Sequence, residues 1–207
     1  MTIRFTRRRA LGALPVLLAC PGAARANPAD IAAASSSIEN FHAALLHAMQ
    51  NPEALDPAGR AAAMRPVMLR VFDMAAMTRI ASGRAWLEFS TEQQAGLVAA
   101  FTDWTVATSL HRAGPFAGES FVAEGGSAQA NGDVMVRSRI ERPGLAAVPL
   151  LYLLRAAEGD FRVVDMYLSG SISELASRRA DFAGLLRAGG ADQLAASLRD
   201  RTAVMLR

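Results

Sequence analysis

The spacing of apolar residues changes twice along this chain, and that order limits the fold more than any other feature. Over residues 27–114 apolar side chains recur every three or four positions, as in amphipathic helices. Over 119–168 they alternate or form short continuous runs, and over 171–206 helical spacing returns. Helices, an antiparallel meander of about four strands, and then helices indicate an α+β fold rather than a parallel α/β sheet.

Several local signals predict where helices begin and end. A first helix is expected over 27–50, with Ile38, Phe41, Leu45 and Met49 on one face. The clearest helix follows Ser90 and carries Leu97, Phe101, Trp104 and Thr108 on one face. The predicted starts are an N-cap at Asp56-Pro57, a cap at Asp73, and two capping boxes at Ser90–Gln93 and Ser171–Glu174. Gly189-Gly190 is expected to separate the last two helices.

The central region predicts four strands. The first is expected over 119–124, with a turn at Gly125-Gly126, and the third over 148–155. In the second, residues 134, 136, 138 and 140 share one face. In the fourth, strict alternation points Phe161, Val163, Asp165 and Tyr167 one way, and Arg162, Val164, Met166 and Leu168 the other.

The first 26 residues have the organisation of a secretory signal. A basic start is followed by Ala10–Cys20, an apolar stretch too short to span a bilayer, and by the small-x-small sequence Ala24-Arg25-Ala26. We therefore expect a signal peptide over 1–26 and a single periplasmic domain over 27–207. Thr6–Leu11 resembles a twin-arginine signal, so export by the Tat or Sec route is open. Leu17–Cys20 weakly resembles a lipobox, which makes a lipoprotein anchored at Cys20 the alternative.

Charge and motif content exclude several classes of function. Residues 27–207 hold 17 arginines and 19 acidic residues, a formal net charge of −2, so nucleic acid is not an expected partner. The sequence has no phosphate-binding glycine loop, no HExxH and no GxSxG. His42 and His47 are five apart and do not share a helix face, so we expect ordinary surface or boundary histidines. No metal and no cofactor are predicted.

Two polar features have competing interpretations. Asp165 lies in an apolar strand, where it is either a structural acceptor or a general base in a pocket. Arg178-Arg179 indicates a solvated helix face or a partner contact. The apolar surface is also ambiguous, because it predicts either a filled core between sheet and helices or the lining of a cavity. Methionine side chains could adapt to a flexible ligand.

The sequence resembles the MlaC/toluene-tolerance family in an ordered set of segments. The segments similar to its helical half are Val71–Met77, Gly83–Trp86, Thr91–Gln94 and Phe101. The segments similar to its second half are Phe116–Glu119, Pro149–Tyr152, Phe161–Asp165 and Gly170–Ser173. Residues 172–182 look most like the hopanoid-associated HpnM branch. Ser171-Ile172-Ser173 departs from the Gly-Val-Ser-Leu pattern of the phospholipid-carrying branch.

This resemblance implies a periplasmic lipid shuttle rather than an enzyme. The implied fold is nuclear-transport-factor-2-like with extra helices and a deep apolar cavity. The implied cargo is a hopanoid or a phospholipid. The implied partners are an inner-membrane transporter of the resistance-nodulation-division or ABC type and, in addition, an outer-membrane component.

A cavity of this kind would be lined by residues from several elements. Our predicted lipid-binding residues are Val71, Phe72, Met74, Met77, Phe101, Trp104, Leu151, Leu153, Val164, Met166 and Leu168. The strand members depend on register, since a shift of one residue moves them to the other face. Two other classes of function stay open: an enzyme of related fold with Asp165 as base, and an adaptor with a filled core that tethers a transporter complex.

Overall fold

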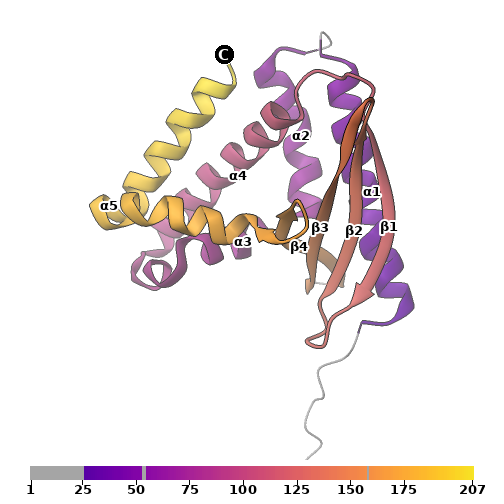
Figure 1. Ribbon diagram of the computed structural model, residues 1–207. Coiled ribbons are helices and arrows are strands. Elements are labelled where there is room, and N and C mark those ends of the chain that lie inside the picture. The colour runs from indigo at the N-terminus through magenta and orange to yellow at the C-terminus, as the bar shows by residue number, and fades with distance from the viewer. Residues whose placement is uncertain (1–25, 53–54, 158) are drawn as a thin grey trace, which may run out of the picture.

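The computed structural model describes residues 26–52, 55–157 and 159–207, so the expected signal sequence lies outside it except for Ala26. Helices occupy both ends of the described chain and strands the middle, which confirms the α+β class (Figure 1). The helices are α1 Pro28–Gln50, α2 Pro57–Val71, α3 Met74–Ser82, the 3-10 helix η1 Gly83–Glu88, α4 Thr91–Ala113 and α5 Glu174–Met205. The strands are β1 Ser120–Ala128, β2 Val134–Arg142, β3 Leu145–Ala157, β4 Asp160–Leu168 and β5 Ile172–Ser173.

Most predicted helix starts are confirmed. Asp56 and Asp73 cap α2 and α3 through their side chains, and Ser90 with Gln93 forms a complete capping box for α4. The exception is α5, where the N-cap is Ser173 and not Ser171. The preceding residues pair with β4 as the short strand β5, so the helix begins only after that pairing ends. The break predicted at Gly189-Gly190 is confirmed as a kink, since both glycines leave helical geometry and divide α5 into two helical segments.

The strands form one antiparallel sheet in the order β1-β2-β3-β4-β5. The predicted turn at Gly125-Gly126 is wrong, because β1 continues through both glycines. A Cβ on Gly126 would lie 2.8 Å from Ile31 Cγ2, so the glycine lets α1 approach the strand closely. Gly125 has φ +87° where the β1–β2 register shifts. This bulge takes up the bend that had been assigned to a turn.

The alternation predicted for β4 is also wrong, and a bulge is the cause. Leu153 pairs with Asp165 while Leu154 pairs with Val163, so Val164 is an extra residue in β4. Before the bulge the odd-numbered residue Val163 lies opposite the buried Leu154. After it the even-numbered Met166 lies opposite the buried Tyr152. The inward face of β4 therefore changes parity within the strand.

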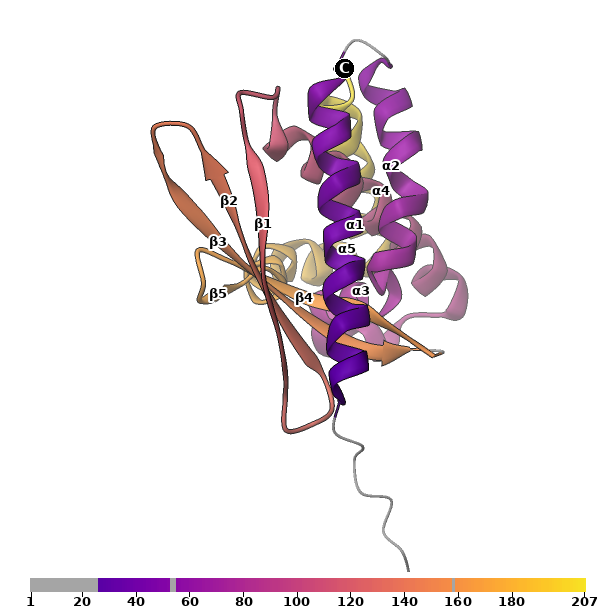
Figure 2. The same ribbon diagram turned by 90° about the vertical axis from the view of Figure 1, so that its right-hand side faces the viewer.

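The helices cover one face of the sheet (Figure 2). α1 packs along β1 and beside α2, while α5 packs on α4 and α3. The junction between α2 and α3 is tied to the sheet, since the Asp73 N–H donates to the Val163 carbonyl at 2.9 Å. No helix within the described part of the chain is long and apolar enough to cross a membrane.

Candidate functional site

A largely apolar cavity of about 360 Å³ lies between the covered face of the sheet and the helices. This volume is near the lower end of the ~300–1,000 Å³ typical of small-molecule pockets. Its apolar wall comes from all five α-helices or their ends and from four strands. The apolar and aromatic lining residues are Phe41, Leu45, Met49, Met68, Phe72, Met77, Phe101, Trp104, Ala113, Phe121, Ile140, Val148, Leu150, Tyr152, Met166, Leu168 and Leu175.

Six of the eleven predicted residues line this cavity. They are Phe72, Met77, Phe101, Trp104, Met166 and Leu168. The other five are elsewhere. Val71 and Met74 are buried in the core without lining the cavity. Their lipid-binding role, like that of the six, stays a prediction.

The remaining misplaced residues are on strands, where register decides the face. Leu151 and Leu153 were predicted to line the cavity, yet Leu150 and Tyr152 do so. The β2 partners of Leu150 and Tyr152 are the buried Ser138 and Val136, which places all four on the covered face. Val164 is buried to 1% exposure, but as the bulge residue it does not reach the cavity.

The lining residues that were not predicted from the sequence include two groups on helices. The first is the stripe of Phe41, Leu45 and Met49 on α1, which had been recognised as a buried face but not assigned to the cavity. The second is a polar group on α4, Thr105, Thr108, Ser109 and Arg112. These residues continue the face of Phe101 and Trp104 toward the end of the helix, so helical spacing was the available signal.

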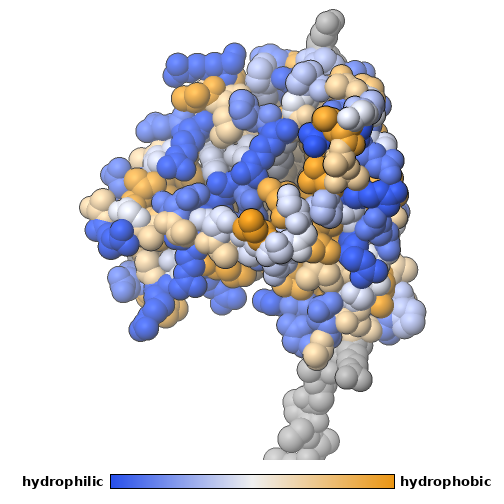
Figure 3. All heavy atoms as spheres, in the orientation of Figure 1, coloured by the Kyte–Doolittle hydropathy of each residue, from blue (hydrophilic) through white to orange (hydrophobic). Residues whose placement is uncertain are grey.

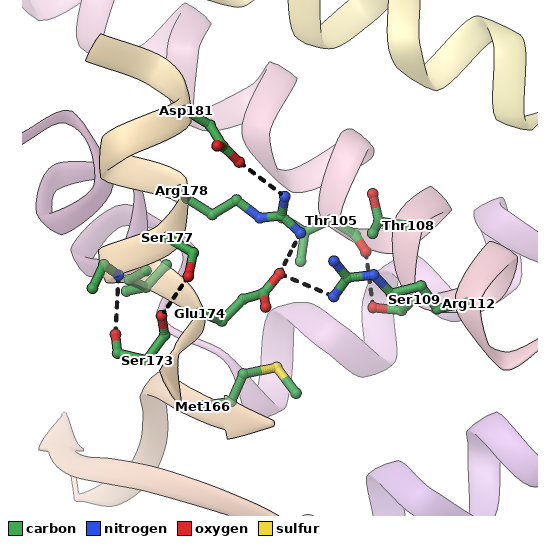
Figure 4. Close-up of polar contacts among 12 residues, drawn as sticks. Thr105, Thr108, Ser109, Arg112, Met166, Ser173, Glu174, Ser177, Arg178 and Asp181 are labelled. Atoms are coloured by element: carbon green, nitrogen blue, oxygen red, sulfur yellow. Dashed lines mark hydrogen bonds and ion pairs between the residues drawn. The ribbon is translucent and has the colours of Figure 1, made fainter. Parts of the chain in front are cut away.

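Charged residues gather where α4 ends and α5 begins (Figure 4). The Glu174 carboxylate lies between two guanidinium groups: Arg112 donates to it at 2.9 Å and Arg178 also pairs with it. Arg178 further approaches Asp181 at 3.6 Å. The Arg178 side chain is only 14% exposed, which contradicts the predicted solvated face at that position.

Arg178 also packs against the aromatic wall. Its Cζ lies 4.6 Å from the centre of the Trp104 ring, within range of a cation–π interaction.

Glu119 and Arg142 add a further carboxylate and guanidinium to the lining. The backbone N–H of Ala117 donates to Glu119 at 2.6 Å and lowers the pKa of that carboxyl, so Glu119 is ionised at neutral pH. The lining therefore combines an apolar wall with three guanidinium and two carboxylate groups.

The surface around these elements is mixed in character (Figure 3). On the face shown, hydrophilic side chains cover most of the surface and hydrophobic ones appear between them in patches.

A buried polar pair lies next to the cavity wall. His42 Nε2 is 2.9 Å from the Tyr152 hydroxyl, and its ring stacks on Phe121 with centroids 4.4 Å apart. His42 is 4% exposed, so the expected surface or boundary position is wrong. Burial lowers the pKa of His42 from 6.5 to about 4 and raises the pKa of Tyr152.

The chain matches one protein family over most of its length. The family described as MlaC protein matches residues 39–200. The chain belongs to the MlaC family. Among solved structures, this MlaC-family chain is similar to a phospholipid-binding protein from Ralstonia solanacearum, solved in complex with a phospholipid. The TM-score is 0.68 at 21% sequence identity, covering 86% of this chain and 99% of that one. No curated protein matches the sequence.

Asp165, the residue considered as a general base, has its carboxylate occupied by structural hydrogen bonds in this MlaC-family fold. The Ser173 hydroxyl donates to it at 2.6 Å, and the backbone N–H groups of Met166 and Leu175 donate at 2.8 and 3.3 Å. Asp165 does not line the cavity. These contacts tie β4 to the start of α5. No group of three or more metal-ligating side chains occurs among the described residues.

We expect Asp165→Asn to lower the free energy of unfolding by about 1–3 kcal/mol. The three hydrogen bonds use both carboxylate oxygens, whereas asparagine has one neutral oxygen and an NH2 group that cannot accept, so at least one partly buried donor loses its partner. Urea unfolding of the variant and the parent measures this difference. Unchanged stability together with loss of a catalytic turnover would instead support the enzyme interpretation.

Proposed function

We propose that this chain is a periplasmic lipid-binding protein that carries a lipid between membranes as part of a transport system. The observation that supports this best is the apolar cavity, which extends from the sheet to α1 and α4 inside a folded domain. Burial of a lipid chain there stabilises the complex by about 0.8 kcal/mol for each methylene group removed from water. Shielding of this kind needs no bond to be made or broken, so we propose binding rather than catalysis.

The comparisons agree with this proposal at the level of the family. A protein of similar fold binds a phospholipid, which makes a phospholipid the first ligand to test. The resemblance of residues 172–182 to the HpnM branch makes a hopanoid the second. We further propose delivery to or from an inner-membrane transporter of the resistance-nodulation-division or ABC type, with an outer-membrane component at the other end.

The test of lipid binding is mass spectrometry of the protein purified from periplasm without added lipid. Organic extraction should release a lipid in an amount approaching that of the protein. Its mass then distinguishes a phospholipid from a hopanoid. Protein that carries no lipid and takes none up from vesicles would contradict the proposal and favour the adaptor.

A further inference from the structure

The charged residues at one end of the cavity have no role in binding an apolar chain. Three of them, Arg112, Glu174 and Arg178, line the cavity. Charged groups beside an apolar chain cost free energy unless they are paired or bind a polar group of the ligand. Arg178 and Glu174 are 14% and 16% exposed, while Arg112 is 48% exposed. The cluster therefore runs from the covered interior to the solvent.

We propose that Arg112 and Arg178 bind the anionic group of a lipid, of the phosphate class, whose apolar chains occupy the rest of the cavity. This inference rests on the proposed lipid-binding function. Guanidinium groups bind phosphate oxygens through short, charge-assisted hydrogen bonds, often in pairs. A single carboxylate, Glu174, now occupies the space between the two guanidinium groups and holds them together.

The position of the cluster fits this role. Both Met166 and Leu175 are apolar lining residues. Leu175 lies on α5 beside Glu174, and Met166 lies on β4, which the Asp165 hydrogen bonds tie to the start of α5. In Figure 4 the Met166 side chain lies on the side of Glu174 toward the sheet. A lipid with its chains against Met166 would place its polar end close to the arginines.

The hydroxyl groups nearby do not supply the same chemistry. Thr105 Oγ1 donates to the Phe101 carbonyl at 2.7 Å, and Ser109 Oγ donates to the Thr105 carbonyl at 2.8 Å. Their protons are used within α4, so they offer acceptors to a ligand. The Thr108 hydroxyl donates to Met205 Sδ at 3.8 Å. The donors that face an anion at this end of the cavity come from the guanidinium groups. The N-terminus of α5, at Glu174, is the positive end of the helix dipole and also favours a negatively charged ligand group.

Two lipids that differ only in the anionic group test the proposal. Dioleoyl phosphatidic acid and dioleoylglycerol are offered separately in neutral dodecyl maltoside micelles, and bound lipid is quantified after gel filtration. We expect the phosphatidic acid to bind about tenfold more tightly, because dioleoylglycerol lacks the phosphate that accepts the charge-assisted hydrogen bonds. Equal affinity for the two lipids would overturn the anion site while leaving lipid binding intact. Binding of neither lipid would instead contradict the proposed function.

Variants separate recognition from a structural role. Arg112→Gln should bring the ratio of the affinities for phosphatidic acid and dioleoylglycerol close to one. Glu174→Gln should increase affinity for phosphatidic acid, because it removes the carboxylate that competes with the phosphate. A cluster that only joins α4 to α5 predicts the opposite for Glu174→Gln, a less stable protein with weaker binding, and that result would overturn the proposal.

The matched control is Arg65→Gln. Arg65 pairs with Asp103 of α4 at 2.8 Å and is 44% exposed, similar to Arg112, but does not line the cavity. It should leave both affinities unchanged, and an equal loss of preference in this variant would overturn the site assignment. Inorganic phosphate at the lipid concentration should not displace phosphatidic acid. Full displacement would show a site for free phosphate instead of a lipid headgroup.

Discussion

Met166→Trp should fold almost as stably as the parent and bind lipid much more weakly. Met166 lines the cavity, so the larger ring enters space that a lipid chain would otherwise fill. Excluding about two or three methylene groups removes about 2 kcal/mol of burial, or about a thirtyfold loss of affinity. Thermal unfolding and the amount of lipid extracted, measured on the same preparation, test both parts.

Val164→Trp is the matched control, two residues away in the same strand. Val164 is 1% exposed at the bulge and does not line the cavity, so tryptophan must overpack the protein and cost about 1–3 kcal/mol or more. The folded fraction should still bind lipid. If Met166→Trp is as destabilised as Val164→Trp, or keeps full lipid occupancy, the space beside Met166 is not used by the ligand.

Acidification should destabilise the protein through His42. The unfolded histidine takes up a proton below pH 6.5, whereas the buried one stays neutral until about pH 4. The unfolded state therefore binds more protons in this window, and the free energy of unfolding falls as the pH falls. The loss by pH 4 is about 3 kcal/mol from this one group.

Urea unfolding between pH 7 and pH 4 measures this effect against two variants. His42→Gln keeps a polar group near the Tyr152 hydroxyl without a titrating ring, so its stability should fall less steeply. His47→Gln replaces an exposed histidine of the same helix and should keep the steep decline. A decline of equal slope in His42→Gln and the parent would assign the effect to other groups.

Local signals predicted most of the helix starts. Asp56, Asp73 and Ser90 were identified from short patterns because an N-cap acts on backbone N–H groups within three residues of itself. Ser171 failed for a non-local reason: the segment after it pairs with β4. A capping pattern cannot indicate that a distant strand takes up the residues that would begin the helix.

The cavity shows where sequence periodicity stops being informative. The alternation in β2 was correct, but in β4 the added residue Val164 reversed the inward face, and nothing in the local sequence indicates such a bulge. Arg112 and Glu174 are 62 residues apart and are brought together only by the packing of α5 on α4. The apolar wall was thus partly predictable from stripes, whereas its charged end was not.

The central claim, that a lipid chain lies inside the cavity, can be measured through Trp104. The chain has two tryptophans, and of these Trp104 lines the cavity while Trp86 does not. Trp86→Phe therefore leaves one fluorescent reporter on the wall. A lipid brominated along its acyl chain, which quenches tryptophan by contact, should quench Trp104 as it binds. Bound bromolipid that leaves Trp104 fluorescence unchanged would place the lipid elsewhere and contradict the account.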